Sequence, residues 1–124
     1  MPAHILLIED DWDLRQEIVE FLRRRQNSVA DCGTLAEARQ AFGERRPDIV
    51  MADIRLPDGD GVSFCLEHAG RHPGTKWLLM SGDTDALRQS RQLKRGPDAP
   101  PYSVLDKPVP LRALDDFVRL ATLR

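Results

Sequence analysis

The chain has few aromatic residues, few cysteines and no long hydrophobic run. Aromatic residues make up 6% of its 124 positions, and the two cysteines, Cys32 and Cys65, form no CxxC pair and show no metal-ligand spacing. Both are therefore expected to be reduced thiols. No apolar run approaches the roughly 18 residues of a membrane span, and no charged leader precedes the first apolar run. We expect a cytoplasmic protein without a membrane partner.

Neither sign of charge dominates the sequence. Its 18 basic residues stand against 20 acidic ones, for a net charge of -2 at pH 7. This balance argues against direct electrostatic binding to nucleic acid or to an anionic membrane. The hydrophobic fraction of 41% is that of an ordinary folded protein. The length predicts a single domain over residues 1–124.

Short apolar runs alternate with amphipathic segments along the whole chain. The apolar runs predict five buried strands, over His4–Ile8, Ser28–Cys32, Asp48–Ile54, Trp77–Met80 and Tyr102–Leu105. The amphipathic segments predict five helices, over Trp12–Gln26, Leu35–Glu44 (with a capping box of Thr34 and Glu37), Val62–Gly70, about Thr84–Leu93, and Leu111–Leu123. Continuous apolar strands separated by helices predict an α/β fold with a parallel sheet covered on both faces.

Acidic, hydroxyl and ammonium groups follow the predicted strands, at the edge where such sheets bind ligands. They are Glu9, Asp10 and Asp11 after the first strand, Asp53 after the third, Ser81 after the fourth, and Asp106 and Lys107 after the fifth. Clustered carboxylates repel one another unless a cation lies between them, and oxygen ligands with several waters suit Mg²⁺. A carboxylate in such a cluster can attack phosphorus. A lysine and a serine hydroxyl can then hold the phosphoryl oxygens.

Four segments resemble the receiver domain of two-component response regulators, and the likeness extends over essentially the full chain. They are LLIEDD at 6–11, DIVMADIRLPDGDG at 48–61, LLMSGD at 78–83 and LDKP at 105–108. The resemblance implies a doubly wound (βα)5 fold with a flavodoxin-like strand order 2-1-3-4-5.

The resemblance also implies a role for each matching residue. Asp53 is implied to be the phospho-acceptor. Asp10 and Asp11 are implied to be the acidic pair that holds Mg²⁺, and Asp53 and the backbone carbonyl of Arg55 complete the ligands. Ser81 is implied to be the switch hydroxyl and Lys107 the phosphate-binding lysine. A protein of this kind is a regulator that promotes its own Mg²⁺-dependent phosphorylation and dephosphorylation. It receives the phosphoryl group from a histidine kinase or phosphotransfer protein and signals to a downstream target or effector domain. Whether it forms a homodimer stays open.

Two features depart from the family pattern. Val104 stands three positions before Lys107, where the family usually has an aromatic switch residue, and the nearest tyrosine is Tyr102. Residues 94–101 contain three prolines, which predict a short preceding helix and a long loop. These departures leave open a receiver-like interaction module that acts without phosphorylation. A phosphatase of the haloacid dehalogenase type is disfavoured, because Arg55 occupies the position of its general acid.

Overall fold

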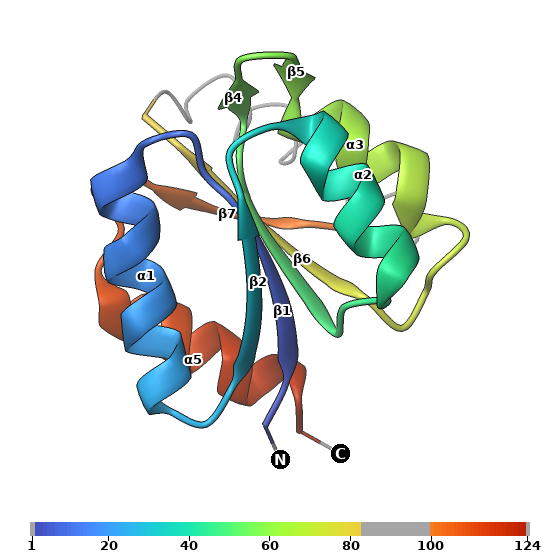
Figure 1. The fold of residues 1–124 in the computed structure, drawn as a ribbon. Helices are drawn as coiled ribbons and strands as arrows, with labels where there is room; N and C mark the ends of the chain where they lie inside the picture. Colours follow the sequence, from blue (N-terminus) through green and yellow to red (C-terminus); the bar gives the residue numbers. More distant parts are fainter. Residues whose placement is uncertain (1, 83–99, 124) are drawn as a thin grey trace.

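The protein folds into a five-stranded parallel sheet with helices on both faces (Figure 1). The computed structural model describes residues 2–82 and 100–123. The strands of the sheet are β1 (His4–Ile8), β2 (Ser28–Cys32), β3 (Ile49–Asp53), β6 (Lys76–Ser81) and β7 (Ser103–Asp106). The helices are α1 (Trp12–Arg24), α2 (Leu35–Glu44), α3 (Gly61–Ala69) and α5 (Leu111–Ala121). The sheet order β2-β1-β3-β6-β7 confirms the predicted topology. The predicted helix over 84–93, and residues 94–99 of the predicted loop, lie outside the described residues.

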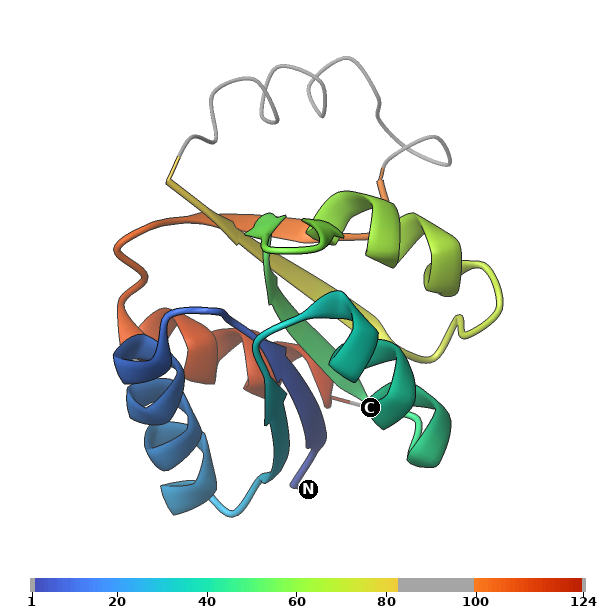
Figure 2. The same ribbon diagram turned by 45° about the horizontal axis from the view of Figure 1, so that its top comes forward.

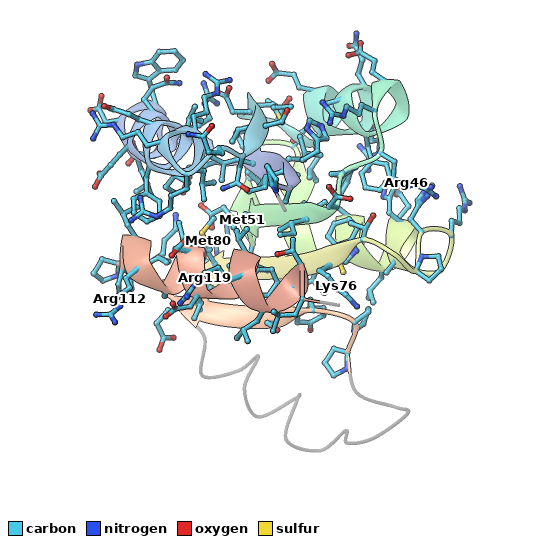
Figure 3. The ribbon with its side chains drawn as sticks, turned by 90° about the horizontal axis from the view of Figure 1, so that it is seen from below. Arg46, Met51, Lys76, Met80, Arg112 and Arg119 are labelled. Atoms are coloured by element: carbon cyan, nitrogen blue, oxygen red, sulfur yellow. The ribbon has the colours of Figure 1, made fainter. Side chains whose placement is uncertain are left out.

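Alternate residues of each central strand face opposite helix layers. On one side, Ile5, Leu7, Met51 and Met80 pack with the apolar faces of α1 and α5. Figure 3, which views the sheet from below, shows Met51 and Met80 together above α5. On the other side, the intervening residues of the same strands pack against α2 and α3, with Trp77 among them. Burial on both faces explains why these strands are continuously apolar in the sequence.

The helix ends follow from local chemistry. The first helix was predicted to reach Gln26, but α1 ends at Arg24 and Gln26 adopts a φ of 70°. A left-handed residue of this kind stops a helix. At α2, the hydroxyl of Thr34 accepts a hydrogen bond from the Glu37 N–H at 3.2 Å, as the capping box predicted. The Glu37 carboxylate in turn accepts from the Thr34 hydroxyl at 3.0 Å, rather than from the backbone N–H.

A small hairpin connects β3 to α3. Its strands are β4 (Arg55–Leu56) and β5 (Gly59–Asp60), and it rises above the carboxyl edge of the sheet (Figures 1 and 2). The carboxylate of Asp58, at the hairpin turn, accepts hydrogen bonds from the N–H groups of Leu35 and Ala36 at 2.8 and 3.0 Å. The hairpin is therefore tied to the first turn of α2, beside the strand ends.

Among the described residues, no helix combines the length and the apolar character needed to cross a membrane.

Candidate functional site

Parallel strand pairing brings the predicted site residues to one edge of the sheet. Asp53 is the last residue of β3 and pairs in register with Met80 of β6. Ser81, the last residue of β6, pairs in register with Asp106 of β7. The backbone N–H of Lys107 then donates to the carbonyl of Ser81 at 2.9 Å. The three residues Asp53, Ser81 and Lys107 thus reach the same place because their strands are neighbours in the sheet.

Lys107 forms ion pairs with two buried carboxylates. Its Nζ donates to Asp53 Oδ2 and to Glu9 Oε1, both at 2.8 Å. The side chain of Glu9 is fully buried, and that of Asp53 is 12% exposed. Carboxylates at such depth need a positive partner, because burial in a medium of low polarity strongly disfavours an uncompensated charge. Lys107 supplies this charge from the far end of the sequence.

Burial and ion pairing pull the pKa values of this cluster in opposite directions. Burial raises the pKa of Glu9, and the hydrogen bonds from Lys107 and from the Asp11 N–H offset only part of this effect. Burial by itself would lower the pKa of Lys107, but the hydrogen bonds to Asp53 and Glu9 outweigh it and raise that pKa. Lys107 is therefore held in its charged form, which suits a group that binds phosphoryl oxygens.

The acidic cluster consists of Glu9, Asp10 and Asp53, whose nearest carboxylate oxygens all lie within 4.8 Å of one another. The sequence predicted Asp10 and Asp11 as the acidic pair. In the structure Asp11 lies outside this cluster and is the N-cap of α1, where its Oδ1 accepts from the Leu14 N–H at 3.2 Å. The sequence placed Glu9 among the charged groups after the first strand but did not assign it to the predicted metal site.

No local signal in the sequence separates Glu9 from Asp11, and the backbone of the structure shows why they differ. The residues of β1 alternate between the two helix layers, and Glu9 continues directly from Ile8 at the strand end. Its backbone N–H still donates to the Cys32 carbonyl at 3.0 Å, as a strand residue would. Asp11, two residues later, already begins the turn into α1. A residue that still pairs as part of the strand projects over the sheet edge, whereas one at the helix start is used for capping.

A pocket of about 260 Å³ opens beside the cluster and is lined by Asp53, Arg55, Ser81, Gly82 and Lys107. Four of these are residues that the sequence predicted for the site. Asp53 and Ser81 are buried, with 9% and 7% of their surface exposed. The pocket is of a size for a small anionic group and its waters rather than for a larger substrate.

Gly61 lies in close contact with the backbone of Asp53. A Cβ at this position would lie 2.4 Å from the carbonyl oxygen of Asp53. The N–H of Gly61 also donates to the Ile54 carbonyl at 2.8 Å, which closes the hairpin back onto the end of β3. Glycine is required here for close approach of two backbone segments.

The residue at the aromatic switch position, Val104, is not among the residues that line the pocket. Val104 packs on the α2 and α3 side of the sheet, together with Tyr102, two residues earlier on the same face. Tyr102 therefore shares the face of Val104 but lies one pleat farther from Lys107 along the strand.

The donor set fits a hard divalent cation. Three carboxylates offer only oxygen ligands, and two of them, Asp10 and Asp53, belong to the set that the sequence predicted for Mg²⁺. Asp10 is exposed, which leaves room for the water molecules that Mg²⁺ keeps. The cluster thus satisfies the chemistry expected for a magnesium site.

Comparisons with known proteins match this chain to one family. The family model of the response regulator receiver domain matches residues 5–119. The transcriptional activator protein PfeR of Pseudomonas aeruginosa is 35% identical over 111 residues, covering 90% of this chain and 35% of PfeR. The transcriptional regulatory protein AfsQ1 of Streptomyces coelicolor is 33% identical over 124 residues, covering 100% of this chain and 52% of AfsQ1.

Solved structures share the fold at low sequence identity. A CheY-like response regulator receiver domain protein from Methanospirillum hungatei JF-1 superposes with a TM-score of 0.83 at 21% identity, covering 97% of this chain and 93% of that one. The chain spans about a third to a half of the length of PfeR and AfsQ1, so it corresponds to one part of those regulators. Because the family match covers nearly the whole sequence, the chain belongs to the receiver domains of two-component response regulators.

Proposed function

We propose that this receiver is a phosphorylation-dependent switch in which Asp53 accepts a phosphoryl group from a histidine kinase or phosphotransfer protein. The observation that carries the proposal is the position of Lys107, whose ammonium lies 2.8 Å from Asp53 beside the small pocket. An aspartate, a lysine and a serine around one cavity provide a nucleophile and two groups for phosphoryl oxygens.

Glu9, Asp10 and Asp53, with the backbone carbonyl of Arg55, are the proposed surroundings of a Mg²⁺ ion. Bound there, Mg²⁺ would neutralise the carboxylates and draw charge from a phosphoryl oxygen. Asp11 is left out of this set, because its carboxylate caps α1. Arg55 lines the pocket that holds Asp53, which supports its inclusion.

The proposed step is an in-line transfer. A carboxylate oxygen of Asp53 forms a bond to phosphorus while the bond from phosphorus to the donor histidine nitrogen breaks. The other ring nitrogen of the phosphohistidine carries a proton, so the histidine leaves with the electron pair of that bond as an uncharged imidazole. Lys107 and the hydroxyl of Ser81 balance the charge on the phosphoryl oxygens, and hydrolysis of the acyl phosphate later restores the free carboxylate.

The output is proposed to pass through a partner or an effector domain. PfeR and AfsQ1 are named as transcriptional regulators and are longer than this chain. An effector segment of that kind is one route for the signal, and docking on a separate target protein is the other. The Val104 position favours a path that does not depend on rotation of an aromatic side chain there.

Intact mass spectrometry tests the proposal directly. The protein is incubated with acetyl phosphate and Mg²⁺, then compared with its Asp53→Asn and Asp116→Asn variants. Asp116 is an exposed acid that pairs with Arg119 on α5, so its variant controls for the loss of a surface carboxylate. We expect a mass gain of one phosphoryl group in the wild type and in Asp116→Asn, and none in Asp53→Asn. Absence of the gain in all three proteins, also with phosphoramidate, would favour the interaction module that acts without phosphorylation.

A further inference from the structure

We propose that Arg15 is a positioning residue for the metal site, and that Gly33 provides the space its guanidinium needs. Arg15 lies in the first turns of α1 and Gly33 follows β2, so neither belongs to the acidic cluster. The inference rests on the proposed function, because it concerns how the Mg²⁺ ligands are held.

The guanidinium of Arg15 ties together three segments at the carboxyl edge of the sheet. Its Nη1 donates a hydrogen bond to the backbone carbonyl of Glu9 at 3.0 Å, and its Nε lies 3.2 Å from Asp31 Oδ2 on β2, an ion pair without a hydrogen bond. Its other side faces the Trp12 ring, with the guanidinium carbon 5.0 Å from the ring centroid. Only 14% of the Arg15 side chain is exposed, so this arrangement is held by packing as well as by charge.

The carbonyl that Arg15 holds belongs to the peptide between two members of the acidic cluster. This peptide joins Glu9 to Asp10, so its orientation sets the direction in which the Cα–Cβ bond of each residue leaves the backbone. The N–H of Glu9 is fixed separately by its hydrogen bond to the Cys32 carbonyl at 3.0 Å. With the carbonyl also fixed by Arg15, the backbone of Glu9 is restrained on both sides. Residues that hold the metal ligands in place, without binding the metal themselves, set the geometry of a metal site.

The absence of a side chain at Gly33 makes this arrangement fit. A Cβ on Gly33 would lie 2.6 Å from Arg15 Nη1, which is too close for two atoms that are not bonded. The same Cβ would lie 3.7 Å from the Glu9 carbonyl oxygen, an ordinary contact distance. An alanine at this position would therefore displace the flexible end of Arg15 and leave the Glu9 backbone unobstructed.

A second arginine of α1 makes a comparable contact at the other end of the sheet. The Nη2 of Arg23 donates to the carbonyl of Val29, near the start of β2, at 2.9 Å. It resembles Arg15 in linking α1 to a backbone carbonyl, but it lies far along the helix from the acidic cluster. Arg23→Ala is thus a matched control for the general effect of removing such a contact.

The experiment measures Mg²⁺ binding to the full chain by isothermal titration calorimetry, which avoids the altered Trp12 fluorescence expected in Arg15 variants. We expect Arg15→Ala and Gly33→Ala each to weaken Mg²⁺ binding by about 10-fold, as is common for partners of metal ligands. Arg23→Ala should bind Mg²⁺ as the wild type does. In acetyl phosphate assays, Arg15→Ala should need about 10-fold more Mg²⁺ for half-maximal phosphorylation, with an unchanged rate at saturating Mg²⁺.

A double-mutant cycle tests whether Gly33 acts through Arg15. If it does, adding Gly33→Ala to Arg15→Ala should cause no further loss of Mg²⁺ affinity. Additive losses would show that Gly33→Ala acts on the loop directly, and would overturn that part of the inference. Equal Mg²⁺ affinities of the wild type, Arg15→Ala and Arg23→Ala would overturn the role of Arg15 while leaving the proposed function intact. A wild type that binds no Mg²⁺ would overturn both.

Discussion

Replacement of Lys107 by methionine should destabilise the metal-free protein and make its stability depend on Mg²⁺. Methionine keeps most of the aliphatic length of lysine and removes the ammonium. In the structure this ammonium is 2.8 Å from both Glu9 and Asp53, and Glu9 is completely buried. Its loss leaves two carboxylates facing each other without the positive charge that now lies between them.

The size of the effect follows from the burial of the three groups. Removing one partner of a buried ion pair costs about 3 to 5 kcal/mol. Lys107 is itself 24% exposed, so water can reach part of the site and the lower value of about 3 kcal/mol applies. For a chain of this length that corresponds to a fall in melting temperature of about 10 °C. The loss should be smaller at mildly acidic pH, where the buried Glu9 can take up a proton instead.

The assay is urea and thermal unfolding with a chelator present, repeated with excess Mg²⁺. Since Mg²⁺ would supply the missing positive charge, it should narrow the gap between Lys107→Met and the wild type. Lys76→Met is the matched control, because Lys76 is an exposed lysine at the start of β6 (Figure 3). It should unfold like the wild type under both conditions.

Two outcomes would refute this reasoning. If Lys107→Met and Lys76→Met had equal free energies of unfolding without Mg²⁺, the ion pairs of Lys107 would not be neutralising buried charge. If Mg²⁺ stabilised the wild type more than it stabilised Lys107→Met, the cation and the ammonium would not be exchangeable sources of positive charge at this cluster.

Three further predictions concern packing and protonation. Gly61→Ala should destabilise the fold by about 2 kcal/mol in urea unfolding, because the new Cβ would lie 2.4 Å from a backbone oxygen. Gly43→Ala should stabilise the fold by about 0.5 kcal/mol, because Gly43 lies in α2 with open space around it. Burial raises the pKa of Cys32 and Cys65 from 9.0 to about 12, so iodoacetamide should modify the native protein about 1,000-fold more slowly than ordinary thiols, as followed by mass spectrometry. Burial lowers the pKa of His4 from 6.5 in the folded protein, so the imidazole binds a proton more tightly in the unfolded chain than in the folded one. The free energy of unfolding should therefore fall as the pH drops below about 6.5, and it should fall less in His4→Asn.

A specific result would contradict each of these three predictions. A neutral Gly61→Ala would mean that the hairpin shifts without cost. Modification of the native cysteines at the rate of exposed thiols would mean that the sheet opens readily near them. An identical pH dependence of unfolding in the wild type and His4→Asn would assign the acid sensitivity to other groups.

The strand residues were predictable because burial on both faces leaves a simple record in the sequence. Runs such as Ile5 to Ile8 and Ile49 to Ala52 are apolar at every position, and both are strands of the observed sheet. Element ends were less predictable. The hairpin of β4 and β5 forms through pairing of only two residues on each side, and a segment so short carries no periodic pattern.

The site was predictable in part, because its residues lie at the ends of the predicted strands. Asp53, Ser81 and Lys107 each end or follow a strand, and parallel strands deliver their carboxyl ends to one edge. Strand order therefore predicted that Asp53 and Lys107 lie at one edge, whereas the pocket that they line is a finding of the structure. The choice between Glu9 and Asp11 was not predictable, because both are acids within one short turn and only their directions differ.

By itself the sequence determined the order of the five sheet strands and of the four described helices, the family and the edge at which the charged groups collect, since these depend on residue type and periodicity. The tertiary structure alone decided that Glu9 joins the acidic cluster while Asp11 caps α1, and that Lys107 lies between Glu9 and Asp53. It also decided that Arg15 reaches back over Gly33 to the Glu9 carbonyl. These contacts join residues from different segments at distances set by packing, and no local pattern in the chain encodes them.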